Sequence, residues 1–224
     1  MLTLSDIHKS YLSGGRPLEV LAGITATVSK GESLAIVGPS GSGKTTLLGI
    51  CAGLDTPTSG QVELMGEPLS SLDEDQRARI RNTHIGFVFQ NFQLIPTLTA
   101  LENVCIPLEL KRRRNPHQRA MEWLDRVGLA DRAGHYPVQL SGGEQQRVAI
   151  ARASVSDPAV LFADEPTGNL DAETSHQIEE LLLAAHRETG NTLILVTHDT
   201  ELAEHTDRIL RLRKGLIESA SNAA

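Results

Sequence analysis

A glycine-rich segment has the residue types and spacing of a phosphate-binding loop. Residues 38 to 45 read Gly-Pro-Ser-Gly-Ser-Gly-Lys-Thr, between an apolar run that ends at Val37 and a helix-forming run that starts at Thr46. Glycines let the backbone curl so that successive N–H groups converge on phosphate oxygens, and the following helix adds the positive end of its dipole. Lys44 can then neutralise the β- and γ-phosphates, and the Thr45 hydroxyl can ligate Mg²⁺. We therefore expect a nucleoside triphosphate to bind here.

The residues expected to form this nucleotide site are Gly38, Pro39, Ser40, Gly41, Ser42, Gly43, Lys44, Thr45 and Thr46.

Other polar groups follow short apolar runs. The runs are Leu34 to Val37, Ile85 to Phe89, Val160 to Ala163 and Leu193 to Val196. Each is too short for a helix and lacks polar alternation, as is typical of strands buried on both faces of a parallel sheet. Gln90, Asp164, Glu165 and His198 come after the last three runs. Ligands bind at the carboxyl edge of such sheets, so the joint placement favours one shared site, although each residue alone could be an ordinary loop residue.

A second glycine motif opens a helix. Leu140-Ser-Gly-Gly-Glu-Gln-Gln-Arg147 precedes the helical run Val148 to Ala153, and Ser141 and Glu144 have the spacing of a capping box. This could be merely a well-capped helix. Two glycines in its first turn lower helix propensity, however, and indicate that the backbone approaches an anion there.

The pattern predicts an α/β fold, a P-loop NTPase core with a mainly parallel sheet, an N-terminal antiparallel β region and an inserted helical subdomain. The antiparallel strands are expected at Leu2 to Ile7 and Val20 to Val28, interrupted by Ser13 to Pro17. We expect a single domain over residues 1–219. Its core is 1–90 and 157–219, its helical subdomain about 91–156, and 220–224 form a tail.

Composition excludes several classes of protein. With 21 basic and 28 acidic residues, the formal charge is −7, so no nucleic-acid partner is expected. Cys51 and Cys105 have no paired Cys/His spacing, which favours buried small hydrophobes in a reducing compartment. The start lacks a leader pattern and no apolar run is long enough to span a bilayer, so we expect a chain neither secreted nor membrane-embedded. The basic cluster from Lys111 to Arg114 indicates a solvated loop, or alternatively a surface for anionic lipid headgroups.

The motifs together resemble the ATP-binding subunits of ABC transporters, from about Leu2 to Gly215. The phosphate loop, the Leu-Ser-Gly-Gly-Glu-Gln signature at 140 to 145, and Ala159-Val-Leu-Phe-Ala-Asp-Glu165 match three of the family's motifs in order. Gln90 matches the Q-loop, Asn169-Leu-Asp171 the D-loop and His198 the switch histidine. Three segments are similar in sequence to the lipoprotein-releasing, macrolide-efflux and YbbA-type branch of the family: Gly86 to Gln90, Pro96 to Val104 and Phe162 to Asp171.

The resemblance implies a division of roles. Mg²⁺ is expected between the β- and γ-phosphates of ATP, held by Thr45, by Asp164 through water and near Gln90. Glu165 is then the general base for water, His198 steadies the γ-phosphate, and Gln90 senses metal and attacking water. Tyr11 resembles the aromatic residue that stacks on adenine, although it could be an ordinary surface tyrosine.

The resemblance also implies partners. The signature residues Ser141, Gly142, Gly143 and Glu144 would serve ATP bound to a second copy, so that two chains close head to tail over two ATP molecules, with Asp171 coupling the sites. A membrane permease subunit is expected to dock near Phe92 to Ile95, at the cytoplasmic face of the inner membrane; packing of the helical insertion is the alternative role of this segment.

Three functions remain open at this stage. The first is a transporter motor that exports or extracts a hydrophobic cargo. An envelope-signalling ATPase of the cell-division type would regulate a partner without moving a solute. A DNA-repair or translation ATPase of the same superfamily is disfavoured, because the interval from Gln90 to Ser141 is too short for a long coiled-coil insertion and the charge is acidic.

Overall fold

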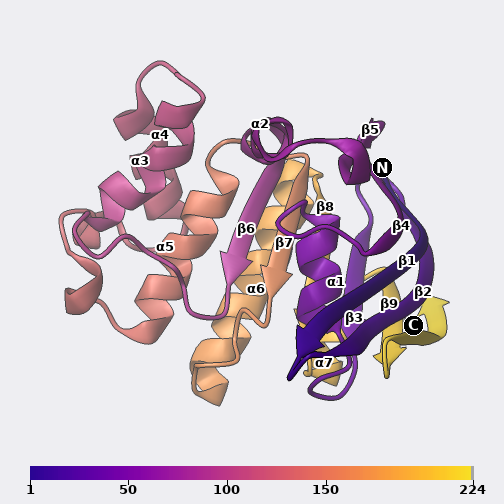
Figure 1. The fold of residues 1–224 in the computed structure, drawn as a ribbon. Coiled ribbons are helices and arrows are strands. Elements are labelled where there is room, and N and C mark those ends of the chain that lie inside the picture. Colours follow the sequence, from indigo (N-terminus) through magenta and orange to yellow (C-terminus); the bar gives the residue numbers. More distant parts are fainter. Residues whose placement is uncertain (223–224) are drawn as a thin grey trace. The chain divides into compact units, whose positions relative to one another are not determined.

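The computed structural model describes residues 1–222, which form two compact units (Figure 1). The first unit comprises Met1–Arg81 and the chain from Thr192 onward, and the second comprises Asn82–Asn191. The boundary at Arg81 lies inside helix α2 (Glu74–His84). The fold class is the α/β class expected, with parallel strand pairs in both units and an antiparallel sheet near the amino terminus.

The antiparallel sheet of the first unit has the strand order β2-β1-β4-β5. Its strands are β1 (Leu2–Ser13), β2 (Arg16–Val28), β4 (Ser59–Leu64) and β5 (Glu67–Pro68). The sequence predicted that a loop from Ser13 to Pro17 interrupts the two strands, but the loop is shorter than that. Gly14 and Gly15, both at positive φ, form a tight hairpin turn, so β1 and β2 stay paired up to Ser13 and Arg16.

The parallel strands of the first unit surround β3 (Ser33–Val37), which pairs with β8 (Thr192–Thr197) on one side and β9 (Arg208–Arg213) on the other. Strand β10 (Leu216–Asn222) adds an antiparallel edge next to β9. Residues 220–222 therefore belong to this strand and not to the expected tail; 223 and 224 lie outside the described residues.

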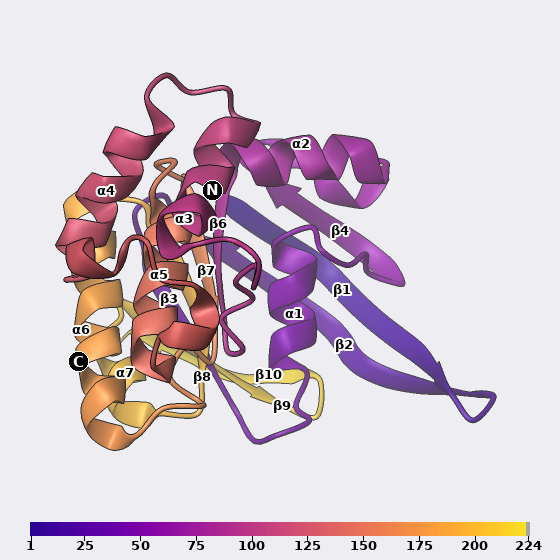
Figure 2. The same ribbon diagram turned by 90° about the vertical axis from the view of Figure 1, so that its left-hand side faces the viewer.

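Helix α1 (Lys44–Cys51) lies between the two sheets of the first unit, since it contacts both β8 and β4 (Figure 2). The short helix α7 (Thr200–Glu204) packs on β3. A one-turn 3₁₀ helix, η1 (Leu69–Ser71), follows β5.

The second unit consists of a parallel strand pair and four helices. Strands β6 (Ile85–Phe89) and β7 (Val160–Asp164) pair in register from Ile85 with Val160 to Phe89 with Asp164. The helices are α3 (Ala100–Leu110), α4 (Pro116–Arg126), α5 (Gly142–Ser154) and α6 (Ala172–Thr189), with 3₁₀ turns η2 (Ala130–Arg132) and η3 (Pro137–Gln139) between α4 and α5. The strands expected from the apolar runs, the helical character of the insertion and the helix at 148–153 are confirmed, with ends shifted by a few residues.

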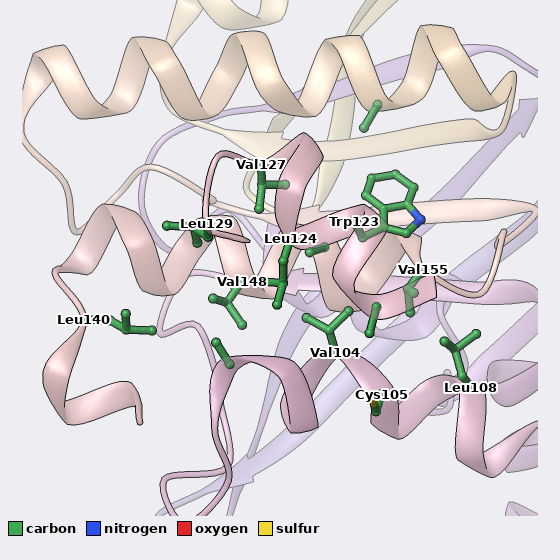
Figure 3. Close-up of a cluster of buried hydrophobic side chains, with 14 residues drawn as sticks. Val104, Cys105, Leu108, Trp123, Leu124, Val127, Leu129, Leu140, Val148 and Val155 are labelled. Atoms are coloured by element: carbon green, nitrogen blue, oxygen red, sulfur yellow. The ribbon is translucent and has the colours of Figure 1, made fainter. Parts of the chain in front are cut away.

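A single hydrophobic cluster holds α3, α4 and α5 together (Figure 3). Trp123 and Leu124 of α4 meet Val104 and Leu108 of α3 and Val148 of α5 in this cluster. The two cysteines are buried and unpaired, as expected. Burial raises the pKa of Cys51 to about 12 and that of Cys105 to about 11, so both thiols stay protonated.

Within residues 1–222, no helix combines the length and the apolar character needed to cross a bilayer.

Replacement of Gly86 by alanine tests the packing of β6 on α5. A Cβ at Gly86 would lie 2.2 Å from the carbonyl oxygen of Ala153, a backbone atom that cannot rotate away. We expect Gly86→Ala to lower the free energy of unfolding by about 2 to 3 kcal/mol. Urea unfolding followed by the fluorescence of Trp123, the single tryptophan, measures this in the same unit.

Gly134→Ala is the matched control, because a Cβ there meets nothing within 4 Å and the backbone φ is not left-handed. It should leave stability unchanged or raise it by up to about 1 kcal/mol. Equal unfolding midpoints for the two variants would contradict the packing argument.

Candidate functional site

In the first unit, the predicted phosphate loop joins the carboxyl end of β3 to the amino end of α1. Gly41 and Gly43 have φ values of 75° and 99°, a region that L side chains rarely adopt. The hydrogen bond from the N–H of Leu47 to the carbonyl of Gly43 (2.8 Å) starts the helix. Among the residues that the structure describes, no side chain caps α1, and its first turn contains no acidic residue. The helix therefore begins as an anion-binding helix does.

Close packing also requires glycine at two loop positions. A Cβ at Gly38 would lie 2.1 Å from the carbonyl oxygen of Leu212, and one at Gly43 would lie 2.8 Å from the side chain of Leu21. The loop is thus pressed against β9 and β2 of its own unit. Its shape depends on these contacts as well as on backbone freedom.

Lys44 and Ser42 fit a phosphate ligand. Lys44 is only 7% exposed, and its ammonium donates hydrogen bonds to the carbonyls of Gly38 (2.9 Å) and Pro39 (3.3 Å), which holds the charge over the loop. The hydroxyl of Ser42 is buried, with no hydrogen-bond partner within residues 1–222. A buried donor of this kind suits a phosphate oxygen. Ser40 and Thr45 are exposed on the same loop.

Tyr11 lies in β1 beside the first turn of α1. Its hydroxyl donates to Asp55 (2.7 Å) and also interacts with the side chain of Thr46, while the ammonium of Lys9 lies 4.8 Å from the ring centroid. Lys9 also bonds Asp55 at 2.7 Å. Burial raises the pKa of Tyr11, and the bond to Asp55 adds to the rise. One ring face is thus covered by a cation and the hydroxyl is fixed, yet the residue remains 42% exposed. Such a ring is oriented to stack on a flat ligand.

His198 lies at the same sheet edge as the phosphate loop. Val37 and Thr197 are register partners in the parallel pair of β3 and β8. Gly38 and His198 each come one residue later, so the ladder carries both to one edge. His198 is exposed there, and Asp199 next to it caps α7 through its bonds to the N–H groups of Glu201 (2.7 Å) and Leu202 (3.2 Å).

In the second unit, the strand register places Gln90 beside Glu165. Phe89 of β6 pairs with Asp164 of β7, so the residues that follow the two strands come to the same carboxyl edge. Glu165 has a φ of 43°, a left-handed conformation that is costly for a side chain with a Cβ. Strain of this kind is concentrated at functional sites. Asp164 and Glu165 are both half-buried.

Asn169 ties the segment after Glu165 to Gln90. Its amide nitrogen donates to the carbonyl of Gln90 (3.1 Å) and the side chain of Asn91 (2.8 Å), and its amide oxygen accepts from Nε2 of Gln90 (3.3 Å). Gly168 makes room for this contact, since a Cβ there would lie 2.8 Å from the Gln90 amide nitrogen. Gly168 and Asn169 therefore orient Gln90 so that its amide oxygen stays outside these bonds.

The predicted capping box at the start of α5 is confirmed. Ser141 Oγ accepts from the N–H of Glu144 (3.2 Å), and Glu144 Oε2 accepts from the N–H of Ser141 (2.8 Å). The bond from the Ser141 backbone lowers the pKa of Glu144. Next to the cap, a Cβ on Gly142 would lie 3.3 Å from Leu170 and 3.7 Å from the ring of Phe92. The signature glycines therefore pack against two other loops of the unit.

Asp171 and Thr174 connect the signature to α6. Asp171 caps α6 by accepting from the N–H (3.0 Å) and the hydroxyl (2.7 Å) of Thr174, and these bonds lower its pKa. The methyl group of Thr174 would lie 2.4 Å from a Cβ at Gly143. Gly143 thus allows α5 to approach Thr174 in the first turn of α6, a contact that sequence spacing could not reveal.

Two side chains that sequence analysis did not identify hold the loop after Gln90. Arg152, at the far end of α5, donates to the carbonyls of Phe92 (2.9 Å) and Gln93, both of which are at positive φ. Burial lowers the pKa of Arg152. Asn103 of α3 is fully buried, and it bonds the backbone of Ile95 through both its amide oxygen (2.8 Å) and its amide nitrogen (3.2 Å). The loop is therefore fixed at two points, and Ile95 stays 43% exposed.

The structure thus groups the predicted site residues within each unit. The first unit holds the phosphate loop, Tyr11 and His198; the second holds Gln90, Asp164, Glu165, the signature and Asp171. No cluster of three or more His, Cys, Asp or Glu side chains within residues 1–222 forms a resident metal site. The Thr45 hydroxyl, the Asp164 carboxylate and the Gln90 amide oxygen are the hard oxygen donors that Mg²⁺ prefers.

The chain is similar to known proteins over nearly its whole length. The family model described as ABC transporter matches residues 21–168. The Escherichia coli K12 protein described as uncharacterized ABC transporter ATP-binding protein YbbA is 53% identical over 97% of this chain and 96% of its own length. The lipoprotein-releasing system ATP-binding protein LolD of Pseudomonas fluorescens is 49% identical over 96% of each chain. The macrolide export ATP-binding/permease protein MacB of Syntrophobacter fumaroxidans is 48% identical, and the chain spans 32% of its length.

Solved structures of ATP-binding cassettes are also similar to this chain. The ATP-binding cassette MJ0796, described as a dimer in a post-hydrolysis state bound to ADP and Pi, is 42% identical and has a TM-score of 0.93, with 100% of this chain and 99% of that chain covered. A second dimeric structure of MJ0796 has the same TM-score and 43% identity. At this identity, the likeness extends beyond the fold to the family.

The contact between Gly143 and Thr174 generates a test of the signature. In Gly143→Ala, the new methyl group forces Thr174 from its place, which breaks the hydroxyl bond to Asp171. We expect a loss of about 1 to 3 kcal/mol in unfolding free energy. Thr174→Ser removes the methyl group that collides but keeps the hydroxyl, so the double variant should recover most of the loss.

A double-mutant cycle by urea unfolding checks this expectation, with Thr174→Ser alone as the control. Additive effects of the two substitutions would show that the glycine is not needed for this contact.

Proposed function

Because the chain belongs to the ABC transporter family, we propose that it drives a separate membrane protein by closing and opening a pair of its own copies around ATP. The chain is an ATPase of that family. One observation carries the proposal. A phosphate loop occupies the strand edge of the first unit, and a Gln, Asp and Glu set with a capped signature helix occupies that of the second.

The phosphate loop binds the nucleotide in this proposal. Its backbone N–H groups and the amino end of α1 surround the phosphates, and the ammonium of Lys44 exchanges its bonds to loop carbonyls for bonds to the β- and γ-phosphates. Tyr11 supplies the flat surface for adenine, with its ring held by Lys9 and Asp55. The Thr45 hydroxyl, the Asp164 carboxylate and the Gln90 amide oxygen would be the donors to Mg²⁺, which, when bound, would neutralise phosphate charge.

Glu165 is the proposed general base. It follows directly after the strand that ends at Asp164, and its backbone is held in a left-handed conformation. It takes a proton from the water that attacks the γ-phosphorus. Gln90, oriented by Asn169, positions that water, and His198 holds the γ-phosphate.

A second copy completes the site in this proposal. The signature residues present a serine hydroxyl, a glycine N–H and the positive end of α5 to the γ-phosphate of the other chain. The solved relative MJ0796 is described as a dimer with ADP and Pi, which supports this arrangement. Loss of the γ-phosphate removes the charge that bridges the two copies, so the pair opens after hydrolysis.

The loop from Asn91 to Ile95 is the proposed docking surface for a membrane subunit. Arg152 and Asn103 fix its backbone, so it is preformed for binding. The ring of Phe92 lies close to Gly142, so it both packs inside the unit and links the loop to the signature. Ile95 is the exposed apolar anchor. Relatives named for lipoprotein release and macrolide export support a hydrophobic cargo.

Replacement of Glu165 by glutamine tests the catalytic assignment. The amide keeps the shape of the side chain but cannot accept the proton, so ATP turnover should fall by about 100-fold to 10,000-fold. ATP should still bind, and the unhydrolysed nucleotide should hold two copies together. Phosphate release measures turnover, and light scattering with size-exclusion chromatography measures the ATP-dependent dimer.

Lys44→Ala is the comparison for this experiment, because it should lose both ATP binding and the dimer. A Glu165→Gln protein that hydrolyses ATP at the wild-type rate, or that stays monomeric with bound ATP, refutes the proposal.

Replacement of Ile95 by serine tests the docking surface. Copurification with the membrane subunit should fall by at least about tenfold, because one desolvated apolar anchor commonly contributes 2 kcal/mol or more. ATP hydrolysis by the isolated chain should stay unchanged. Met65→Ser removes a similarly exposed apolar side chain from the other unit and should have no effect on copurification. Equal recovery of the membrane subunit with both variants would exclude Ile95 as its anchor.

A further inference from the structure

The turn between α3 and α4 carries the four consecutive basic residues of the chain, and one of them anchors it. Lys111 is half-buried, and its ammonium donates to the hydroxyl (3.0 Å) and the carbonyl (3.2 Å) of Ser156 and to the carbonyl of Thr83 (3.1 Å). Burial lowers the pKa of Lys111, and the charge of Arg113 lowers it further. This lysine is therefore used to hold the turn in place within its unit.

The three arginines that follow are presented outward. Arg112, Arg113 and Arg114 are exposed, and none forms an ion pair with any residue from 1 to 222. Arg112 and Asn115 have left-handed backbone conformations (φ 51° and 54°), so the turn is tight and keeps the charges close together. Three like charges at neighbouring positions repel one another, and a bound anion relieves that repulsion.

An apolar side chain and a hollow adjoin the arginines. Leu110, the last residue of α3, is 66% exposed directly before the basic run. The arginines line a hollow of about 500 Å³ together with Leu108, Arg119, Ser156 and Asp157. Asp157 is already paired with Arg119. Guanidinium groups next to an exposed leucine form the mixed surface that lies at the boundary between headgroups and acyl chains of a membrane.

The basic turn contrasts with the rest of the chain, which is acidic. The formal charge is −7, and without these four basic residues it would be −11. We propose that the turn from Leu110 to Arg114 binds the anionic headgroups of a lipid bilayer. The arginines take the phosphate groups, while Leu110 enters the interface beside them. Each cationic side chain near an anionic membrane surface contributes about 1 kcal/mol, so three of them give reversible, salt-sensitive binding.

Membrane lipid fits this surface better than nucleic acid. A nucleic-acid site gains its affinity from a wider array of phosphate contacts, and the acidic remainder of the chain opposes approach to a long polyanion. A bilayer requires only a small protruding patch. An exposed leucine also has no role on a duplex, whereas in the membrane interface its burial is favourable.

Vesicle sedimentation of the full chain without nucleotide tests the proposal, so its result is independent of ATP hydrolysis. Wild-type protein should bind vesicles of phosphatidylcholine with about one-third phosphatidylglycerol, and should bind pure phosphatidylcholine vesicles far less. The triple variant Arg112→Ser, Arg113→Ser, Arg114→Ser should lose roughly 100-fold in binding to the anionic vesicles. Leu110→Ser should reduce binding by a smaller factor, and raising the salt from about 0.1 M to about 0.5 M should release the wild type.

Matched controls separate this turn from net charge. Arg16→Ser, Lys30→Ser, Arg187→Ser changes charge by the same amount at exposed positions elsewhere and should bind like the wild type. The triple variant Arg112→Lys, Arg113→Lys, Arg114→Lys keeps the charge and should retain most of the binding, which tests the site even if the serine triple folds poorly. Equal binding to neutral and anionic vesicles, full binding by the serine triple, or equal losses in both serine triples overturns the proposal.

Discussion

Parallel backbone pairing is the constraint on which both parts of the site depend. The register of β3 with β8 brings Gly38 and His198 to one edge, although they are far apart in sequence. The register of β6 with β7 does the same for Gln90 and Glu165. A slip of one residue would move every side chain of the strand to the opposite face, and these strands are largely buried, so the register is strongly specified. The hydrophobic core therefore fixes where the chemistry can occur.

Helix α5 connects the loops of the second unit. Its first turn packs against Phe92 and Leu170, and Gly143 makes room for Thr174 at the start of α6. The buried amide of Gln146 donates to the carbonyl of Pro166 (2.7 Å), which lies in the segment after Glu165. A displacement of α5 must therefore disturb the segment after Glu165, the cap of α6 and the loop that contains Phe92 together. This explains physically why a signature motif combines small residues with buried amides.

Sequence patterns predicted the strands, the phosphate loop and the signature cap because each depends on local chemistry: apolar runs, glycine spacing and the Ser141–Glu144 pair. They did not predict the partners of Arg152 or Asn103, since carbonyls of a distant loop leave no mark in the residue types. The length of the strands on either side of Gly14 was predicted wrongly for a different reason. Two adjacent glycines can either end a strand or form a tight turn between two paired strands, and only the pairing of β1 with β2 shows which of the two occurs.

Arg152 joins the loop from Asn91 to Ile95 to helix α5. Its guanidinium is half-buried and is satisfied by backbone carbonyls of Phe92 and Gln93. If the loop moved away from α5, this partly buried charge would lose its acceptors, which is unfavourable. The loop and the helix therefore move together as one piece. The bonds of Arg152 therefore give a direct physical link from the loop that contains Ile95 to the helix that begins after Ser141.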